Sequence, residues 1–163
     1  MKKCFFILTF FIATIAAFPQ MFSTQLGVDF FNYDKGFLDF RLAYHQNLAE
    51  SMELKLGADI GINTTQRGGE IVADFLLTGE IGLVFLFPAS QSLIPYVGVG
   101  LSPQFVIAEP AFFYLGPYLD AGLRIKVHPN MDLITELKQE LPVGPPAWIN
   151  NCTRISAGII FHF

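Results

Sequence analysis

The stretch Ser156-Ala157-Gly158-Ile159-Ile160-Phe161-His162-Phe163 decides the fold class, and the chain ends on its second aromatic residue. Ser156, Gly158 and His162 share one parity, whereas Phe161 and Phe163 share the other. A period of two is that of a β-strand, whose side chains point alternately to opposite faces. A half-buried strand of a soluble protein rarely ends on an unpaired Phe. We therefore expect Phe163 to belong to the strand and to its apolar face.

The same alternation recurs through the chain. In the segment 37–45, Leu38 and Leu42 lie on one face, while Asp39 and Arg41 lie on the other. No charged residue lies on the face that carries Leu38 and Leu42. The pattern predicts eight strands, with ends uncertain by roughly 2–4 residues, at 24–32, 37–46, 51–62, 71–87, 93–102, 114–127, 131–141 and 152–163.

The connections between these segments alternate in length. Those at 46–50, 88–92 and 128–130 are short, whereas those at 63–70, 103–113 and 142–151 are longer; the turn 33–36 is the exception. An even strand count places both termini and the short turns on one side, as in bacterial membrane barrels.

The composition distinguishes a membrane protein from a soluble one. Mean hydropathy is +0.46 and 52% of residues are hydrophobic, yet no later apolar run approaches the roughly 20 residues of a spanning helix. A spanning protein without helices must be a closed barrel, because lipid cannot satisfy an open sheet edge. We predict an all-β, eight-stranded antiparallel up-and-down transmembrane β-barrel.

The first residues indicate export. Lys2 and Lys3 precede an apolar run that ends at Ala16 and Ala17, the pattern of a cleavable signal peptide over 1–17. One barrel domain, 18–163, would remain. Its eight Lys and Arg against 14 acidic residues give a net charge of −6, which disfavours nucleic-acid binding. Cys4 would leave with the signal, so Cys152 would have no disulfide partner.

The terminal strand, the signal and the motif Pro95-Tyr96-Val97-Gly98-Val99-Gly100 together resemble the small eight-stranded outer-membrane barrels of the protein W and protein X groups. The resemblance implies a location in the bacterial outer membrane. It also implies that the barrel-assembly machinery reads Gly158, Phe161 and Phe163, although both aromatic residues also suit a lipid-facing surface. Protein W relatives are associated with a hydrophobic ligand channel, so a small hydrophobic ligand is a further implied partner besides outer-membrane lipid.

The charged parity is expected to face the barrel interior, because an Arg in contact with lipid costs roughly 2–4 kcal/mol near the midplane. Buried ions must then pair. This interior charge network is predicted to contain Asp39, Arg41, Glu53, Lys55, Asp120, Arg124, Lys126, Glu136, Lys138 and Arg154, with Asp29, Asp59, Glu80 and Asp132 on the same parity.

Two outer connections are unusually apolar. Phe105, Phe112, Phe113 and Tyr114 belong to one, and Trp148 belongs to another. Exposed apolar surface tends to mark a binding site, so one interpretation is a hydrophobic mouth that binds a small apolar ligand. The other is strand extension with an aromatic girdle.

These features favour a non-enzymatic barrel, either a surface-exposed structural or adhesion module or a narrow conduit for small hydrophobic molecules. A lipid-modifying barrel enzyme needs a Ser, His and acid constellation, and no serine lies convincingly near His45, His128 or His162 in the sequence. No catalytic residue, metal site or cofactor is predicted. A secreted lipocalin-like barrel remains the other alternative, since alternation alone does not tell lipid from water outside.

Overall fold

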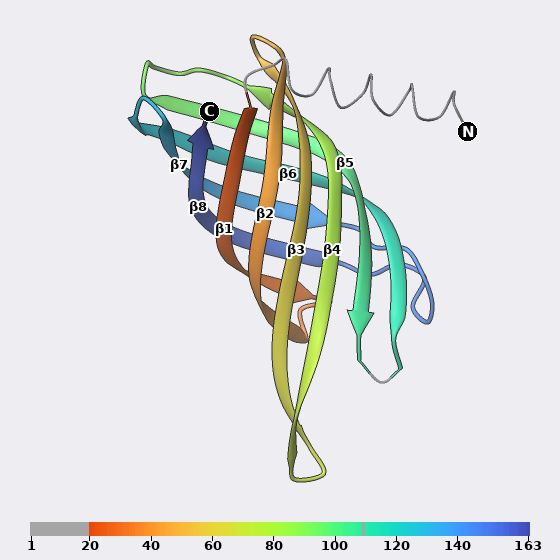
Figure 1. Cartoon of the computed structure of the whole chain (residues 1–163). Coiled ribbons are helices and arrows are strands. Elements are labelled where there is room, and N and C mark those ends of the chain that lie inside the picture. Colours follow the sequence, from red (N-terminus) through yellow and green to blue (C-terminus); the bar gives the residue numbers. More distant parts are fainter. Residues whose placement is uncertain (1–19, 109) are drawn as a thin grey trace, which may run out of the picture.

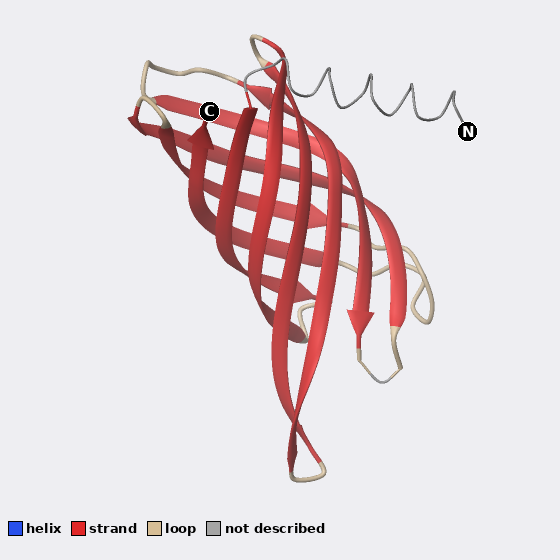
Figure 2. Ribbon diagram, viewed as in Figure 1, coloured by secondary structure: helices blue, strands red, loops and turns tan. Residues whose placement is uncertain are grey.

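Eight antiparallel strands account for most of the chain in the computed structural model (Figures 1 and 2), which describes residues 20–108 and 110–163. The expected signal peptide, 1–17, lies outside the described residues. The strands are β1 (Gln20–Phe31), β2 (Lys35–Ala49), β3 (Met52–Arg67), β4 (Glu70–Leu86), β5 (Leu93–Ile107), β6 (Phe112–His128), β7 (Met131–Glu140) and β8 (Cys152–His162).

The sheet closes on itself in chain order. Each strand pairs with the next, and β1 pairs with β8 from Met21 opposite His162 to Phe31 opposite Cys152. Closure leaves the barrel wall without an unpaired edge. The predicted eight-stranded up-and-down barrel is confirmed.

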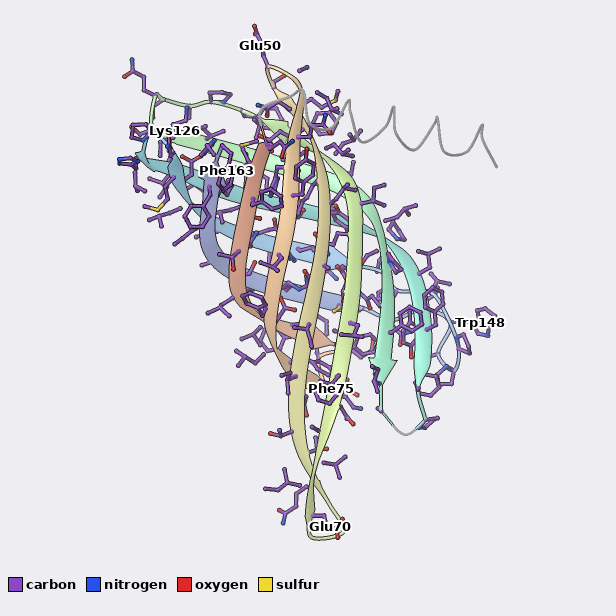
Figure 3. All side chains as sticks on the ribbon, in the orientation of Figure 1. Glu50, Glu70, Phe75, Lys126, Trp148 and Phe163 are labelled. Carbon is purple, nitrogen blue, oxygen red and sulfur yellow. The ribbon has the colours of Figure 1, made fainter. Side chains whose placement is uncertain are left out.

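The barrel has two distinct ends. The end that holds Gln20 and Phe163, here called the terminal end, also holds the turns 50–51, 87–92 and 129–130. The opposite loop end holds the connections 32–34, 68–69, 108–111 and 141–151. Glu50 and Phe163 mark the terminal end in Figure 3, and Glu70 marks the tip of the β3–β4 hairpin, which projects furthest from the loop end.

Two segments that the sequence predicted to be loops are largely β-strand in the structure. The segment 63–70 continues the β3–β4 ladder to a two-residue turn, where Gly68 and Gly69 adopt φ values of +61° and +91° that favour glycine. The segment 103–113 shrinks to a connection over 108–111. Pro103 lies inside β5, and the β4–β5 pairing is interrupted beside it because proline has no N–H to donate.

The two faces of the wall have opposite chemistry. Along β2, Leu38, Phe40 and Leu42 are exposed on the outside, while Asp39 and Arg41 are buried inside. The same alternation holds along the other strands, so the exterior is an apolar belt and the ions lie within. A lipocalin-like barrel, with apolar residues inside and charges outside, has the reverse arrangement. Among residues 20–108 and 110–163, no helix is long and apolar enough to cross a membrane.

The interior is filled in three layers. Near the loop end lies an apolar cluster of Phe31, Phe37, Leu76, Val106, Tyr114 and Cys152. Near the terminal end lies a second apolar cluster of Met21, Val84, Tyr96, Ile134 and Ile160. Charged and polar side chains occupy the space between them. We call the first cluster the outer plug and the second the inner plug.

A charge placed on the belt should destabilise the barrel according to its depth. Leu42, 55% exposed, lies at the middle of β2, and Leu48, 49% exposed, lies near its end. We expect Leu42→Arg to lower the free energy of unfolding in lipid by roughly 2–4 kcal/mol and Leu48→Arg by about 0–1 kcal/mol. Urea unfolding in bilayers measures both. Equal effects of the two substitutions would contradict a lipid-facing belt.

Candidate functional site

Four cations from four strands organise the middle layer. Arg41 on β2, Lys55 on β3, Lys138 on β7 and Arg154 on β8 are all fully or almost fully buried. Each lies on the inward parity of its strand, and the register between the strands brings them to similar depths of the barrel. Their buried acidic partners are Asp29, Asp39, Asp59, Glu80, Asp120, Glu136 and Glu140.

The two arginines share their partners. Arg41 lies 2.9 Å from Asp59 through Nε and 3.0 Å from Glu80 through Nη2, and it also binds Glu136. Arg154 lies 2.8 Å from Asp29 and 3.2 Å from Glu80, and it also binds Asp59. Glu80 and Asp59 therefore bridge the two guanidinium groups, and the planar fork of Arg suits such multiple contacts.

The lysines complete the network on the other side of the barrel. Lys55 Nζ lies 2.9 Å from both Asp120 Oδ2 and Glu136 Oε2. Lys138 binds Glu80 and Glu140, and its Nζ lies 4.4 Å from the centroid of the Tyr118 ring. A cation at that distance from an aromatic centroid gains a cation–π attraction. The network thus spans the full width of the lumen.

Carboxylates outnumber cations in this layer. Asp39 is the least satisfied of them: both of its oxygens lack a hydrogen-bond partner, and Arg154 Nε lies 3.5 Å away. Gly27 on β1 and Gly61 on β3 flank it in the sheet. Seven carboxyl groups therefore share four cations in the middle layer.

A separate polar chain lies toward the terminal end. Ser23 Oγ is 3.0 Å from His45 Nε2, His45 Nδ1 is 3.4 Å from Glu53 Oε2, and Arg124 donates to both oxygens of Glu53 at 2.6 and 2.7 Å. No pattern in the sequence indicated a serine beside His45, because the contact arises from the register between β1 and β2. A Ser–His–acid order is that of nucleophilic hydrolases.

The same geometry does not provide a working nucleophile. Ser23 is 2% exposed and points into the filled lumen, opposite the fully buried Ile160. Arg124 already neutralises Glu53 through two hydrogen bonds. A substrate carbonyl has no route to Ser23 Oγ, and the chain instead satisfies buried polar groups.

The structure places nine of the ten residues predicted for the network in the interior, and Lys126 is the exception. Lys126 is exposed at the terminal end (Figure 3), where the β6–β7 register shifts between Lys126 and His128. Its ammonium reaches water there, so an inward orientation is not required. Asp74 and Glu140 are also buried in the interior but were not predicted from the sequence. Glu140 shares the parity of Glu136 and Lys138, and this signal could have identified it.

The predicted aromatic mouth is divided between two faces. Phe105 and Phe113 are exposed on the outer wall, with ring centroids 4.6 Å apart. Phe112 and Tyr114 point inward, and Trp148 is 70% exposed on the 141–151 connection (Figure 3). Phe105 and Phe113 therefore fit the girdle interpretation, whereas Phe112 and Tyr114 belong to the interior.

A cavity of about 210 Å³ opens above the outer plug at the loop end. The connections 32–34, 108–111 and 141–151 all contribute to its wall, and the plug forms its floor. Its lining includes four aromatic rings, one acidic and one basic side chain, as follows: Phe31, Asn32, Asp34, Lys35, Phe37, Val106, Ala108, Pro110, Phe112, Tyr114, Pro146, Ala147 and Asn150.

No protein-family model matches the chain, and no curated protein is significantly similar in sequence. Solved structures do match. Neisserial surface protein A superposes with a TM-score of 0.73 at 14% identity, covering 90% of this chain and 97% of that one. The protein has the fold of the small eight-stranded outer-membrane β-barrels.

Two further barrels support this assignment of the fold. Ail, the attachment invasion locus protein of Yersinia pestis, matches with a TM-score of 0.60 at 10% identity, covering 89% of this chain and 97% of that one. The N-terminal β-barrel domain of Pseudomonas aeruginosa OprF matches with a TM-score of 0.55 at 16% identity, covering 88% and 97%. At these identities the likeness concerns the fold.

In the described residues, no group of three or more His, Cys, Asp or Glu side chains is arranged to hold a metal ion. The carboxylates of the middle layer are instead engaged by Arg and Lys. In the polar interior, Arg and Lys side chains neutralise carboxylates that have been removed from water.

Removing one cation from the middle layer should be costly. Arg41→Met leaves Glu80 and Glu136 with less positive charge nearby, and breaking a buried ion pair costs about 3–5 kcal/mol. We expect a loss of that size in urea unfolding, partly restored by adding Glu136→Gln. Lys126→Met, at the exposed rim, is the matched control and should change stability little. A neutral effect of Arg41→Met would exclude a structural role for the network.

Proposed function

We propose that the protein is a non-enzymatic integral barrel of the bacterial outer membrane that anchors a surface-exposed structural or adhesion module. The observation that carries this proposal is the combination of an apolar exterior with a sealed interior. The exterior suits hydrocarbon, and packed side chains fill the interior. What the molecule offers to other molecules is then its loop end.

A sealed interior follows from the size of the barrel and from its contents. An eight-stranded barrel is about wide enough for side chains to fill. Here the outer plug, the ion network and the inner plug follow one another along the axis. A conduit for small hydrophobic molecules would have to cross the ionic layer, so the anchoring role is the better supported of the two.

The named functions of the similar structures agree with a surface role. One is a Neisserial surface protein, and another is an attachment invasion locus protein. Ail has also been crystallised with the heparin analogue sucrose octasulfate. Among the described residues, the loop end of the present chain has three acidic residues, Asp34, Glu70 and Asp74, against Lys35 and Arg67. That balance does not favour a polyanion as its partner.

The terminal strand supports an outer-membrane route. Phe161 and Phe163 are exposed on the outer wall at the terminal end, and Gly158 pairs with Gln25 of β1. We infer that these residues form the signal read by the barrel-assembly machinery, and that 1–17 is the export signal. With the terminal end in the periplasm, the loop end faces the cell exterior.

The sealed lumen predicts an electrical result. Purified protein reconstituted in planar bilayers should show no steady ion conductance, because the two plugs and the ion network occupy the axis. A porin reconstituted under the same conditions is the positive control. Reproducible single-channel steps from the unaltered protein would refute the anchoring role and favour a conduit.

The orientation predicts which turns are accessible on cells. An epitope tag inserted between Gly68 and Gly69 should be cleaved by protease on intact cells, whereas a tag between Pro129 and Asn130 should be cleaved only after permeabilisation. Combining the first tag with Phe161→Ala and Phe163→Ala should reduce the surface signal, because assembly would fail. Cleavage of the second tag on intact cells would reverse the proposed orientation.

A further inference from the structure

The cavity at the loop end is formed by segments far apart in sequence. Asn32 Nδ2 donates to Asn150 Oδ1 at 2.9 Å, and Asn32 Oδ1 accepts from the backbone N–H of Asn151 at 2.9 Å. These bonds hold the β1–β2 turn against the 141–151 connection. Asn150 Nδ2 also donates to the carbonyl of Ala147 at 2.6 Å. The wall of the cavity is thus fixed before any ligand arrives, which reduces the entropic cost of binding.

Four aromatic rings line this cavity. Phe31 and Phe37 belong to the floor, while Phe112 and Tyr114 come from β6. The ring centroids of Phe31 and Tyr114 are 5.6 Å apart, and those of Phe112 and Tyr114 are 6.2 Å apart. Such a group of rings attracts apolar groups and, through the negative faces of the rings, cations.

The volume limits the ligand to a small group. Pockets for drug-sized molecules measure about 300–1,000 Å³, whereas this one measures about 210 Å³. A lipid chain or a large ring system does not fit. A compact head group or a single ring does.

The charges around the cavity favour a cation. Asp34 and Lys35 both line it. Lys35 lies 3.4 Å from the buried Asp74, which offsets its charge, whereas Asp34 has no ion-pair partner among the described residues. Below the floor, Asp29 and Asp39 belong to a layer in which carboxylates outnumber cations. An apolar lining in a negative field is the environment that stabilises a weakly hydrated cation.

We propose that the loop-end cavity binds a small organic cation of the alkylammonium class, such as a trimethylammonium group, with its methyl groups against the aromatic rings and its charge near Asp34. The access of such a ligand from outside the cell rests on the orientation proposed above. The binding itself rests on the cavity alone.

Choline and its neutral isostere 3,3-dimethyl-1-butanol are the probes that test this assignment. Binding is measured by isothermal titration calorimetry, because Trp148, the only tryptophan, is 70% exposed and does not line the cavity. The full chain is titrated at constant ionic strength in a maltoside detergent, which has no ammonium group. Choline should bind saturably, and on the order of tenfold more tightly than the isostere.

Three variants separate the proposed contacts from general effects. Asp34→Asn, in an exposed turn, and Phe112→Leu, in the lining, should each weaken choline binding on the order of tenfold. Phe113→Leu changes the neighbouring ring on the outer wall and should leave binding unaltered. A heat-modifiability gel verifies that each variant is folded. Equal affinity for choline and the isostere, or no saturable response, would overturn the proposal.

Because detergent exposes both ends of the barrel, these titrations do not depend on where the protein lies in the cell. A failure to bind choline would leave the surface-anchor role intact, whereas an inverted orientation in the protease experiment would leave the site intact. The two proposals therefore fail separately.

Discussion

The structure depends on one electrostatic constraint: charges excluded from hydrocarbon on the outside must be paired with one another on the inside. In a soluble protein an apolar core drives folding and charges face water. Here the apolar side chains already face the medium they prefer, and the interior is left for Arg41, Lys55, Lys138 and Arg154 with their carboxylates. Because β1, β2, β3, β4, β6, β7 and β8 each contribute a charged side chain to this layer, its ion pairs form only when these strands have come together. Closure and charge pairing are therefore one event.

The outer and inner plugs place apolar side chains near the two ends of the barrel interior. Near the loop end the interior changes from ions to Phe37 and Tyr114, whereas near the terminal end Tyr96 and Ile160 lie at the depth of the Glu53–Arg124 pair. The apolar plugs keep water from the ionic layer and so strengthen each ion pair within it. They also occupy the axis of the barrel, which supports the proposal that this polar interior does not conduct. The aromatic cavity above the outer plug is a consequence of the same layering.

The period of two was enough to predict the fold and most of the interior from the sequence. It assigned Arg41 and Arg154 to the inside because a lipid-facing Arg is expensive. The period of two did not predict the extension of β3 through Thr64 to Gln66. A strand that is surrounded by water needs no apolar face, so its sequence does not alternate. The period also could not reveal the contact of Ser23 with His45, which arises from the register of β1 against β2. The aromatic residues of 105–114 were grouped as a loop, whereas their parity divides them between wall and interior.

The length of the β3–β4 hairpin is not constrained by its neighbouring strands. Beyond Ile62 and Phe75 its two strands pair only with each other, and from Ile62 to the Gly68–Gly69 turn the chain rises about 20 Å at the usual 3.3 Å per residue. Adding or deleting matched pairs of residues there alters neither the stagger nor the circumference of the cylinder. The length of this hairpin can therefore change during evolution without altering the packing of the rest of the barrel. It is the segment in which length variation is best tolerated.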